Sequence, residues 1–428
     1  MEGGAAPWYG WFVPHARNVA RALLAALLLA TPIARAQDAT PATRTPARAG
    51  YALEPWLTGA TLPVAVATDP DGGDAVLVVQ LEGLVRTARG GVLREAPFLD
   101  LRHRVTGLAG EQGLFTVALE PTSAARDRPR QVVAAFTEVG TGDLIVAAYP
   151  VDPRTWTADA AAEVVVFRVP MPEPFHHGGQ VRFGPDGALY ASIGNGERSP
   201  TFLATRPWSA QSLATLRGKI VRVRLLATAL DGAPRPYAVP DDNPFLAVDD
   251  PPEGAVRPEI WALGFRNPWK FAFDPRDGAA LVADVGEDRW EEVNRVASGG
   301  NYGWPIREGR ECLEHPDVSE WVEPACTSIP LDGPWIAYGH LDVDPGGGLA
   351  VTGGVVVSDP ELPELVGRYV FGDFVTGRVW VWNGETGRRD VLLDSGLALT
   401  AIDVGPAGEV LLVAVDGRIL RLRSEQVR

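Results

Sequence analysis

The chain has 428 residues, of which 22% are charged and 46% hydrophobic, and it contains 47 glycines and 37 prolines. This composition excludes a disordered chain, a coiled coil and a collagen-like repeat. Its 54 acidic residues outnumber the 39 lysines and arginines, and the formal charge of −15 argues against a nucleic-acid-binding surface. Because Lys219 and Lys270 are the only lysines, Schiff-base chemistry has almost no candidate residue.

Residues 1–36 have the pattern of a secretory signal peptide. Arg17 and Arg21 precede an apolar run at residues 22–30, which is followed by Ala34-Arg-Ala36. We therefore expect cleavage before Gln37 and a periplasmic or secreted protein, with an N-terminal amphipathic helix as the alternative. The apolar run is about half the ~20 residues that a membrane span needs, and no later segment is comparable. The mature chain is predicted to have no transmembrane segment.

Two further features concern the mature chain outside its strands. Residues 37–50, rich in Pro, Thr, Arg and Ala, predict a linker. Cys312 and Cys326 are the only cysteines, and export would place them where a disulfide persists. Such a short loop would add on the order of 3 kcal/mol of stability. Two free buried thiols are the alternative.

From residue 51 to residue 428, a strand-turn-strand pattern recurs six times. Each unit is a short apolar or alternating run that ends in Asp, Pro or Gly and leads into a second apolar run. Proline cannot continue a strand ladder, and glycine supplies the turn. The units begin at Val64, Val117, Val181, Phe271, Val355 and Ile402. We expect one all-β domain, a six-bladed β-propeller, because two β-sandwiches would need a mid-chain linker that is missing.

A propeller places function in the loops around its axis, and one such loop contains His176-His177-Gly178-Gly179. A neutral imidazole there suits a general base, and the alternative is a loop histidine whose hydrogen bonds are satisfied. Adjacent residues of a strand point to opposite faces, so only one of the two histidines can reach a central site.

A second loop contains Arg266-Asn267-Pro268. The guanidinium of Arg266 is a fork of donors suited to carboxylate or quinone oxygens. Asn267 precedes a proline and is therefore held extended, which fixes where its amide points. A surface arginine beside an asparagine turn is the alternative.

The segment from Asp284 to Glu292 holds five carboxylates within nine residues. Such charges repel one another unless a cation or basic groups lie among them. Oxygen-rich loops suit Ca²⁺, with backbone carbonyls beside glycine as extra ligands, although the spacing is not that of an EF-hand. A solvated acidic turn is the alternative.

Taken together, these segments resemble the glucose/sorbosone dehydrogenase superfamily, whose six-bladed propellers include quinoprotein aldose sugar dehydrogenases and hedgehog-interacting-protein-like propellers. The resemblance covers about residues 62–422. It depends on the order of several motifs, among them Gly110-Glu-Gln-Gly, the His176 segment, Ala262-Leu-Gly-Phe-Arg-Asn-Pro, Asp284-Val-Gly, Trp290-Glu-Glu-Val-Asn and Gly300-Asn-Tyr-Gly-Trp-Pro.

The resemblance implies a sugar dehydrogenase that uses pyrroloquinoline quinone (PQQ) and Ca²⁺ and oxidises the C1 hydroxyl of an aldose to the lactone. His176 would be the general base, and Arg266 and Asn267 would lie beside the cofactor. Backbone oxygens of Gly286 and Glu287 would hold one Ca²⁺, and a second would involve Glu291, Glu292 and Tyr302. The electron acceptor would be a separate molecule, since the chain has no haem-attachment C-x-x-C-H motif.

Some positions depart from the quinoprotein pattern. Thr400 and Ile402 occupy the places of two arginines that grip the carboxylates of PQQ, and residues 374–377 lack the family's cofactor lysine. An unpaired carboxylate in the channel would cost several kcal/mol. Arg378 or Arg418 could substitute from a neighbouring position. The alternative function is a secreted propeller that has lost PQQ and binds a carbohydrate or protein without turnover, and a Ca²⁺-dependent lactone hydrolase is a third.

Overall fold

The computed structural model describes residues 50–106, 110–125, 129–198, 208–226, 236–246, 255–313 and 326–425. The predicted signal peptide, and all of the predicted linker except Gly50, lie outside the described residues. Within the described ranges, no helix is long and apolar enough to cross a membrane.

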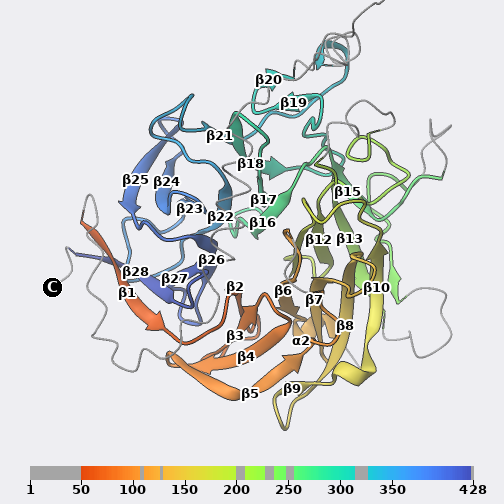
Figure 1. The fold of residues 1–428 in the computed structure, drawn as a ribbon, viewed down its shortest axis with the longest axis vertical. Coiled ribbons are helices and arrows are strands. Elements are labelled where there is room, and N and C mark those ends of the chain that lie inside the picture. The colour runs from red at the N-terminus through yellow and green to blue at the C-terminus, as the bar shows by residue number, and fades with distance from the viewer. Residues whose placement is uncertain are drawn as a thin grey trace, which may run out of the picture.

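Six small antiparallel sheets surround a central axis as the blades of a β-propeller, which confirms the predicted fold (Figure 1). Blades 1 and 2 contain β2 (Pro63–Thr68), β3 (Ala75–Gln80), β4 (Leu84–Arg89) and β5 (Val92–Asp100), then β6 (Leu114–Leu119), β7 (Gln131–Thr137), β8 (Leu144–Asp152), β9 (Thr157–Ala158) and β10 (Val164–Val169). Blades 3 and 4 contain β11 (Gly178–Phe183), β12 (Leu189–Ile193), β13 (Lys219–Leu225), β14 (Tyr237–Ala238) and β15 (Ile260–Leu263), then β16 (Pro268–Phe273), β17 (Ala280–Asp284), β18 (Trp290–Val296) and β21 (Ile336–Gly339). Blades 5 and 6 contain β22 (Val351–Val356), β23 (Tyr369–Asp373), β24 (Arg378–Asn383) and β25 (Arg388–Asp394), then β26 (Leu399–Val404), β27 (Val410–Ala414), β28 (Ile419–Ser424) and β1 (Tyr51–Leu57).

The six strand-turn-strand units of the sequence are the two innermost strands of each blade, from β2–β3 to β26–β27. The inner strands contact their neighbours around the ring, and apolar side chains of adjacent blades pack into shared clusters. The second strands are therefore buried on both faces, as β17 and β27 illustrate, since every residue of each is buried.

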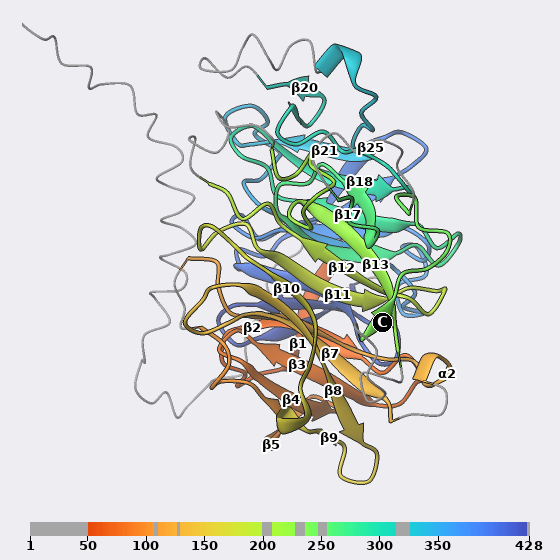
Figure 2. The same ribbon diagram turned by 90° about the vertical axis from the view of Figure 1, so that its right-hand side faces the viewer.

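The ring is closed by pairing between the two ends of the propeller. β1 is antiparallel to β28, with Leu53 opposite Leu422, so the first strand completes the last blade. A short arm of β19 (Arg307–Glu308) and β20 (Glu311–Cys312) lies at the edge of the molecule beside blade 4 (Figures 1 and 2). The predicted disulfide between Cys312 and Cys326 is present, with its Cα atoms 5.9 Å apart. The helical elements are α2 (Thr122–Ala125) and η1 (Ala160–Ala162) in the parts of the chain named above, with one helical turn at residues 326–328.

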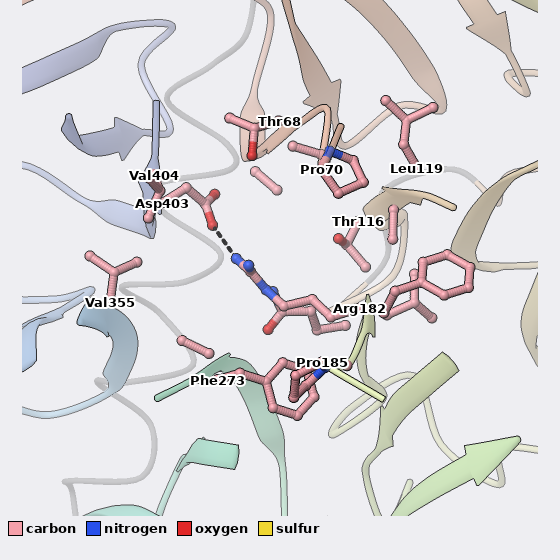
Figure 3. A pocket seen from close by; sticks show the side chains of 18 of the residues that line it. Thr68, Pro70, Thr116, Leu119, Arg182, Pro185, Phe273, Val355, Asp403 and Val404 are labelled. Atoms are coloured by element: carbon pink, nitrogen blue, oxygen red, sulfur yellow. Dashed lines mark hydrogen bonds and ion pairs between the residues drawn. The ribbon is translucent and has the colours of Figure 1, made fainter. Parts of the chain in front are cut away.

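An ion pair crosses the central channel at the end where the inner strands run into their turns. Arg182 of β11 donates to Asp403 of β26 at 3.1 Å, over a cavity of about 410 Å³ (Figure 3). The other carboxylate oxygen of Asp403 accepts the backbone N–H of Val66 in β2 at 2.8 Å. Asp403 thus connects blades 1, 3 and 6, of which blades 3 and 6 lie on opposite sides of the axis.

Replacement of Asp403 by alanine is expected to lower the free energy of unfolding by about 1.5 kcal/mol, because Arg182 and the Val66 N–H lose a buried acceptor. Urea denaturation measures the loss. Asp416→Ala is the control, since Asp416 forms an exposed pair with Arg418 that contributes little. Equal losses in the two variants would contradict a bracing role for Asp403.

Candidate functional site

Three chain segments meet at the opposite end of the channel, where the inner strands begin. The side-chain oxygen of Asn267 accepts the backbone N–H of Gly178 at 3.0 Å. The backbone N–H groups of Arg266 and Asn267 donate to Asp284 at 3.0 and 2.7 Å. The guanidinium of Arg266 pairs with Glu287, with Nε at 2.7 Å from the carboxylate. The structure therefore brings His176, Arg266, Asn267 and the Gly286–Glu287 turn to one place.

His176 is held in a geometry that leaves one ring nitrogen free to act as a base. Its Nδ1 lies 2.8 Å from the carbonyl oxygen of Glu197, so Nδ1 carries the proton and Nε2 carries the lone pair. Across the parts of the chain that are described, no hydrogen bond to Nε2 is found. Burial, with the charge of Arg266 beside it, holds the pKa of His176 well below its usual value. The imidazole is neutral at physiological pH and can accept a proton.

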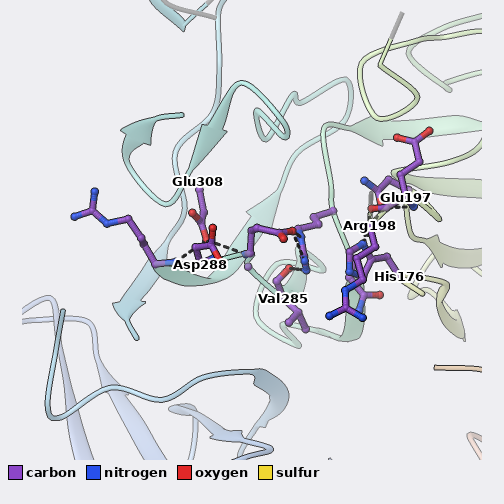
Figure 4. Close-up of polar contacts among 12 residues, drawn as sticks. His176, Glu197, Arg198, Val285, Asp288 and Glu308 are labelled. Carbon is purple, nitrogen blue, oxygen red and sulfur yellow. Dashed lines mark hydrogen bonds and ion pairs between the residues drawn. The ribbon is translucent and has the colours of Figure 1, made fainter. Parts of the chain in front are cut away.

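The backbone of His176 supports a functional rather than a merely structural role. Its φ is 52°, in the left-handed region that few side chains adopt, at a cost of about 1 kcal/mol or more. By contrast, His177 directs Nε2 to the carbonyl oxygen of Glu173 at 2.9 Å and packs edge-on against Phe115. The two rings thus have different surroundings, and His176 is the one beside Arg266 and Arg198 (Figure 4).

Glu111 is a site residue that the sequence analysis did not single out. Its carboxylate accepts the backbone N–H of His176 at 2.8 Å and the side-chain amide of Asn267 at 3.3 Å. Burial raises the pKa of Glu111, partly offset by the His176 hydrogen bond and by the charge of Arg266. Its signal in the sequence was its place in the Gly110-Glu-Gln-Gly motif, which contributed to the family resemblance without a role assigned to Glu111.

A cavity of about 110 Å³ adjoins this cluster, and its wall is mostly apolar. Glu111, Gln112, Asn267 and Thr400 supply its polar groups. The opposite wall is formed largely by side chains such as Trp269, Phe374 and Val415. Among the described residues, no lysine or arginine lines this cavity.

The predicted second calcium site is dispersed in the structure. Glu291 and Glu292 are consecutive residues of β18, so their side chains lie on opposite faces. Glu291 accepts hydrogen bonds from His340 (2.9 Å) and from the N–H groups of Val351 (2.8 Å) and Gly286 (3.2 Å). Glu292 accepts hydrogen bonds from the side-chain amide of Asn294 at 3.1 Å and from the N–H of Gly309. The hydroxyl of Tyr302 bonds to the backbone of Arg295 and Ala297. Within the described ranges, no three metal-ligating side chains cluster, and these calcium ligands stay a prediction.

The acidic segment nevertheless holds buried charge that a cation would stabilise. Burial raises the pKa of Asp284 to about 7 and, together with repulsion from Asp284, that of Glu292 to about 8. A nearby divalent ion would lower both values. The Gly286–Glu287 turn is held instead by Glu308, whose Oε1 accepts the backbone N–H of Glu287 at 2.8 Å (Figure 4).

A family model described as Glucose / Sorbosone dehydrogenase matches residues 60–421. The chain belongs to this family. It is 37% identical to the HIPL1 protein of Arabidopsis thaliana over 224 residues, which cover 50% of this chain and 31% of that protein. It is 29% identical to the aldose sugar dehydrogenase YliI of Escherichia coli over 59% of this chain and 64% of that protein. It is 28% identical to the Hedgehog-interacting protein of Mus musculus over 74% of this chain and 42% of that protein. The matches thus span about a third to two thirds of the length of these three relatives.

Solved structures of this family share the fold. The apo form of the soluble aldose sugar dehydrogenase from Escherichia coli has a TM-score of 0.67 at 25% identity, covering 87% of this chain and 99% of that chain. The PQQ-bound aldose sugar dehydrogenase of Streptomyces coelicolor has a TM-score of 0.63 at 22% identity, covering 88% and 99%. Family membership and fold are therefore secure, and both confirm the resemblance inferred from the motifs.

The residues of this cavity do not fit PQQ, whose three carboxylates need cations. At one arginine position of the quinoprotein pattern, the hydroxyl of Thr400 donates to the carbonyl oxygens of Pro63 and Val413. At the other, Ile402 is buried in an apolar cluster. Neither possible substitute lines the cavity, because Arg378 pairs with Asp394 and Arg418 with Asp416. Carboxylates against this wall would meet no cation of the lining, at a cost of several kcal/mol each, and the site arginine Arg266 lies outside the lining and is already paired with Glu287.

Proposed function

We propose that this chain is a glucose/sorbosone dehydrogenase family propeller that has lost PQQ and binds a neutral sugar or polyol at the His176 end of its channel. The observation that carries the proposal is the cavity wall, which is apolar and bears no described cation. A neutral ligand avoids the desolvation cost that a polyanion would pay there.

The cavity has the groups that recognise a sugar. Trp269 and Phe374 offer flat apolar surface to the C–H face of a sugar ring, and Trp269 is fixed by its hydrogen bond to the carbonyl of Thr400 at 3.0 Å. The Glu111 carboxylate lines the cavity and is an acceptor for hydroxyl groups; it also accepts the backbone N–H of His176, whose ring lies outside the lining. A hydroxyl donating to Glu111 makes a charge-assisted hydrogen bond.

Thermal unfolding of the mature protein with PQQ and Ca²⁺, and separately with glucose or sorbitol, tests the proposal. We expect a sugar to raise the midpoint while PQQ leaves it unchanged, since a ligand that binds only the folded state stabilises it. Glu111→Gln should abolish the sugar-dependent rise, and the exposed variant Glu95→Gln should keep it. A PQQ-dependent rise at micromolar concentration would overturn the loss of PQQ.

A PQQ- and Ca²⁺-dependent sugar dehydrogenase is the second candidate, and the free Nε2 of His176 favours it. In that function His176 would take the proton of the sugar's C1 hydroxyl, with Arg266 and Asn267 beside the cofactor. Ca²⁺ would be held at Gly286 and Glu287, and in a second site by Glu291, Glu292 and Tyr302. A separate electron acceptor completes the reaction. The candidate requires sugar-dependent dye reduction that His176→Ala abolishes without unfolding the protein.

Export to the periplasm or the medium is part of the same proposal. The disulfide between Cys312 and Cys326 supports it, because such bonds persist in oxidising compartments. Cell fractionation of the full-length protein, with N-terminal sequencing to locate cleavage before Gln37, tests it.

A further inference from the structure

A groove of about 700 Å³ lies on the outer side of blades 4 and 5, remote from the channel. It is bordered by β18 and β21 of blade 4 and by β24 and β25 of blade 5, with β20 at one end. In Figure 1, β24 and β25 lie at the upper left, and β18, β21 and β20 lie toward the top centre. No residue that lines the groove also lines the cavity that contains Glu111 and Asn267, so a ligand here is independent of the proposed function.

Four of the 13 tryptophans line this groove, namely Trp290, Trp335, Trp380 and Trp382. Trp380 is fully buried in its floor, and the other three are half-buried. The rings of Trp335 and Trp382 are 5.6 Å apart and steeply inclined. The indole nitrogens of Trp290, Trp380 and Trp382 are buried, so these rings line the groove with carbon atoms rather than with their N–H groups.

The groove also carries positive charge on a chain whose formal charge is −15. Arg389 is held by Asp344 and lies over the rings of Tyr338 and Trp380. The carboxylate of Glu311 pairs with Arg289 at 3.0 Å. Arg310 and Arg388 are exposed and form no ion pair with any described residue, and the guanidinium of Arg310 donates to the neutral carbonyl oxygen of Pro334 at 2.7 Å. Two unbalanced guanidinium groups therefore face the groove.

We propose that this groove binds an oligosaccharide that contains uronic acid residues. Flat indole faces match the C–H faces of pyranose rings, and guanidinium forks match carboxylates in a bidentate manner. The volume lies in the range of small-ligand sites, whereas a stable protein partner needs about 800 Å² of surface on each side. Arg310 and Arg388 select the acidic sugar over a neutral one of the same shape.

Titration of the mature protein with hexagalacturonate and with maltohexaose, followed by tryptophan fluorescence and calorimetry in low salt, tests the proposal. We expect binding of the acidic hexamer that weakens with added NaCl, and no binding of the neutral hexamer. Arg388→Ala should weaken binding about tenfold, as should Trp382→Ala. Arg94→Ala removes an exposed arginine from blade 1 and should change nothing.

Three outcomes would overturn the proposal: no binding of hexagalacturonate, equal binding of maltohexaose, or equal weakening in Arg94→Ala. If Trp382→Ala does not fold, Arg388→Ala carries the test, because its side chain is exposed and supports no other residue through an ion pair. Glu111→Gln should bind hexagalacturonate normally, which separates this groove from the cavity that contains Glu111 and Asn267.

Discussion

Replacement of Glu308 by alanine is expected to lower the free energy of unfolding by about 3 kcal/mol and to disorganise the turn beside Arg266. Glu308 is 3% exposed, and its Oε1 accepts the backbone N–H groups of four consecutive residues, Glu287 to Trp290, at 2.8 to 3.2 Å. Alanine removes the shared acceptor, and water can reach only the more exposed of these donors. Urea denaturation of the purified variant measures the loss.

Two further variants separate the role of the oxygen from that of the arm that carries it. Glu308→Gln keeps a carbonyl oxygen at the same position, so its loss should be less than half that of alanine. Glu311→Ala removes an exposed carboxylate from the same arm and should cost under about 0.5 kcal/mol. A glutamine variant as unstable as the alanine variant would show that the negative charge, rather than the hydrogen-bond acceptor, holds the turn.

The fold was predictable because its signal is local. In four of the six units a short turn with proline or glycine joins the two inner strands, and in the other two, β6–β7 and β22–β23, the connection is longer, so a stretch of about 20 residues contains most of each pattern. The closure of the ring is different, because Tyr51 lies opposite Ser424 and no local pattern relates them. The arm of β19 and β20 was likewise not predicted, since two-residue strands give no periodicity.

Site residues could be predicted from the sequence only where they belong to a short, recognisable motif. His176, Arg266 and Asn267 were identified by resemblance, and the structure brings them together. Glu111 was missed because its role arises from contacts with residues 65 and 156 positions away. Glu308 was missed for the same reason, since its partners lie 18 to 21 positions away in a different turn.

The acidic segment shows where the sequence analysis took a strand for a loop. Asp284 to Glu292 was expected to be one oxygen-rich turn, but β18 begins at Trp290. Period-two alternation then separates Glu291 from Glu292, and each carboxylate finds its own hydrogen-bond donors. The run Trp290-Glu-Glu-Val-Asn contains too few apolar residues to predict a strand by itself. It forms a strand in the structure because it pairs with β17 on one side and with β21 on the other.

The chain has two lysines, both buried, and they differ in how many acceptors surround the ammonium group. Lys219 donates to the carbonyl oxygens of Ser209, Ala210 and Arg217 at 2.7 to 3.1 Å. Lys270 of blade 4 donates to the carbonyl oxygen of Phe115 in blade 2 at 3.0 Å. Burial lowers the pKa of Lys270 from 10.5 to about 8, with Asp403 opposing the shift and Arg182 adding to it. The buried charge of Lys270 therefore lowers the stability of the folded protein.

Lys270→Met should raise the free energy of unfolding at pH 7 by about 2 kcal/mol, since the desolvation cost of about 3 kcal/mol is removed and one hydrogen bond is lost. Because the folded pKa lies below the unfolded one, the unfolded chain binds more protons between pH 8 and 10.5, and the stability of the native protein rises with pH across that window. The Lys270→Met variant should lack this rise.

Lys219→Met should instead lower the free energy of unfolding by about 3 kcal/mol, because three carbonyl oxygens lose their hydrogen-bond donor. Urea denaturation at pH 7, 8.5 and 10 distinguishes the two lysines, and a destabilised Lys270→Met would show that the ammonium group braces the channel.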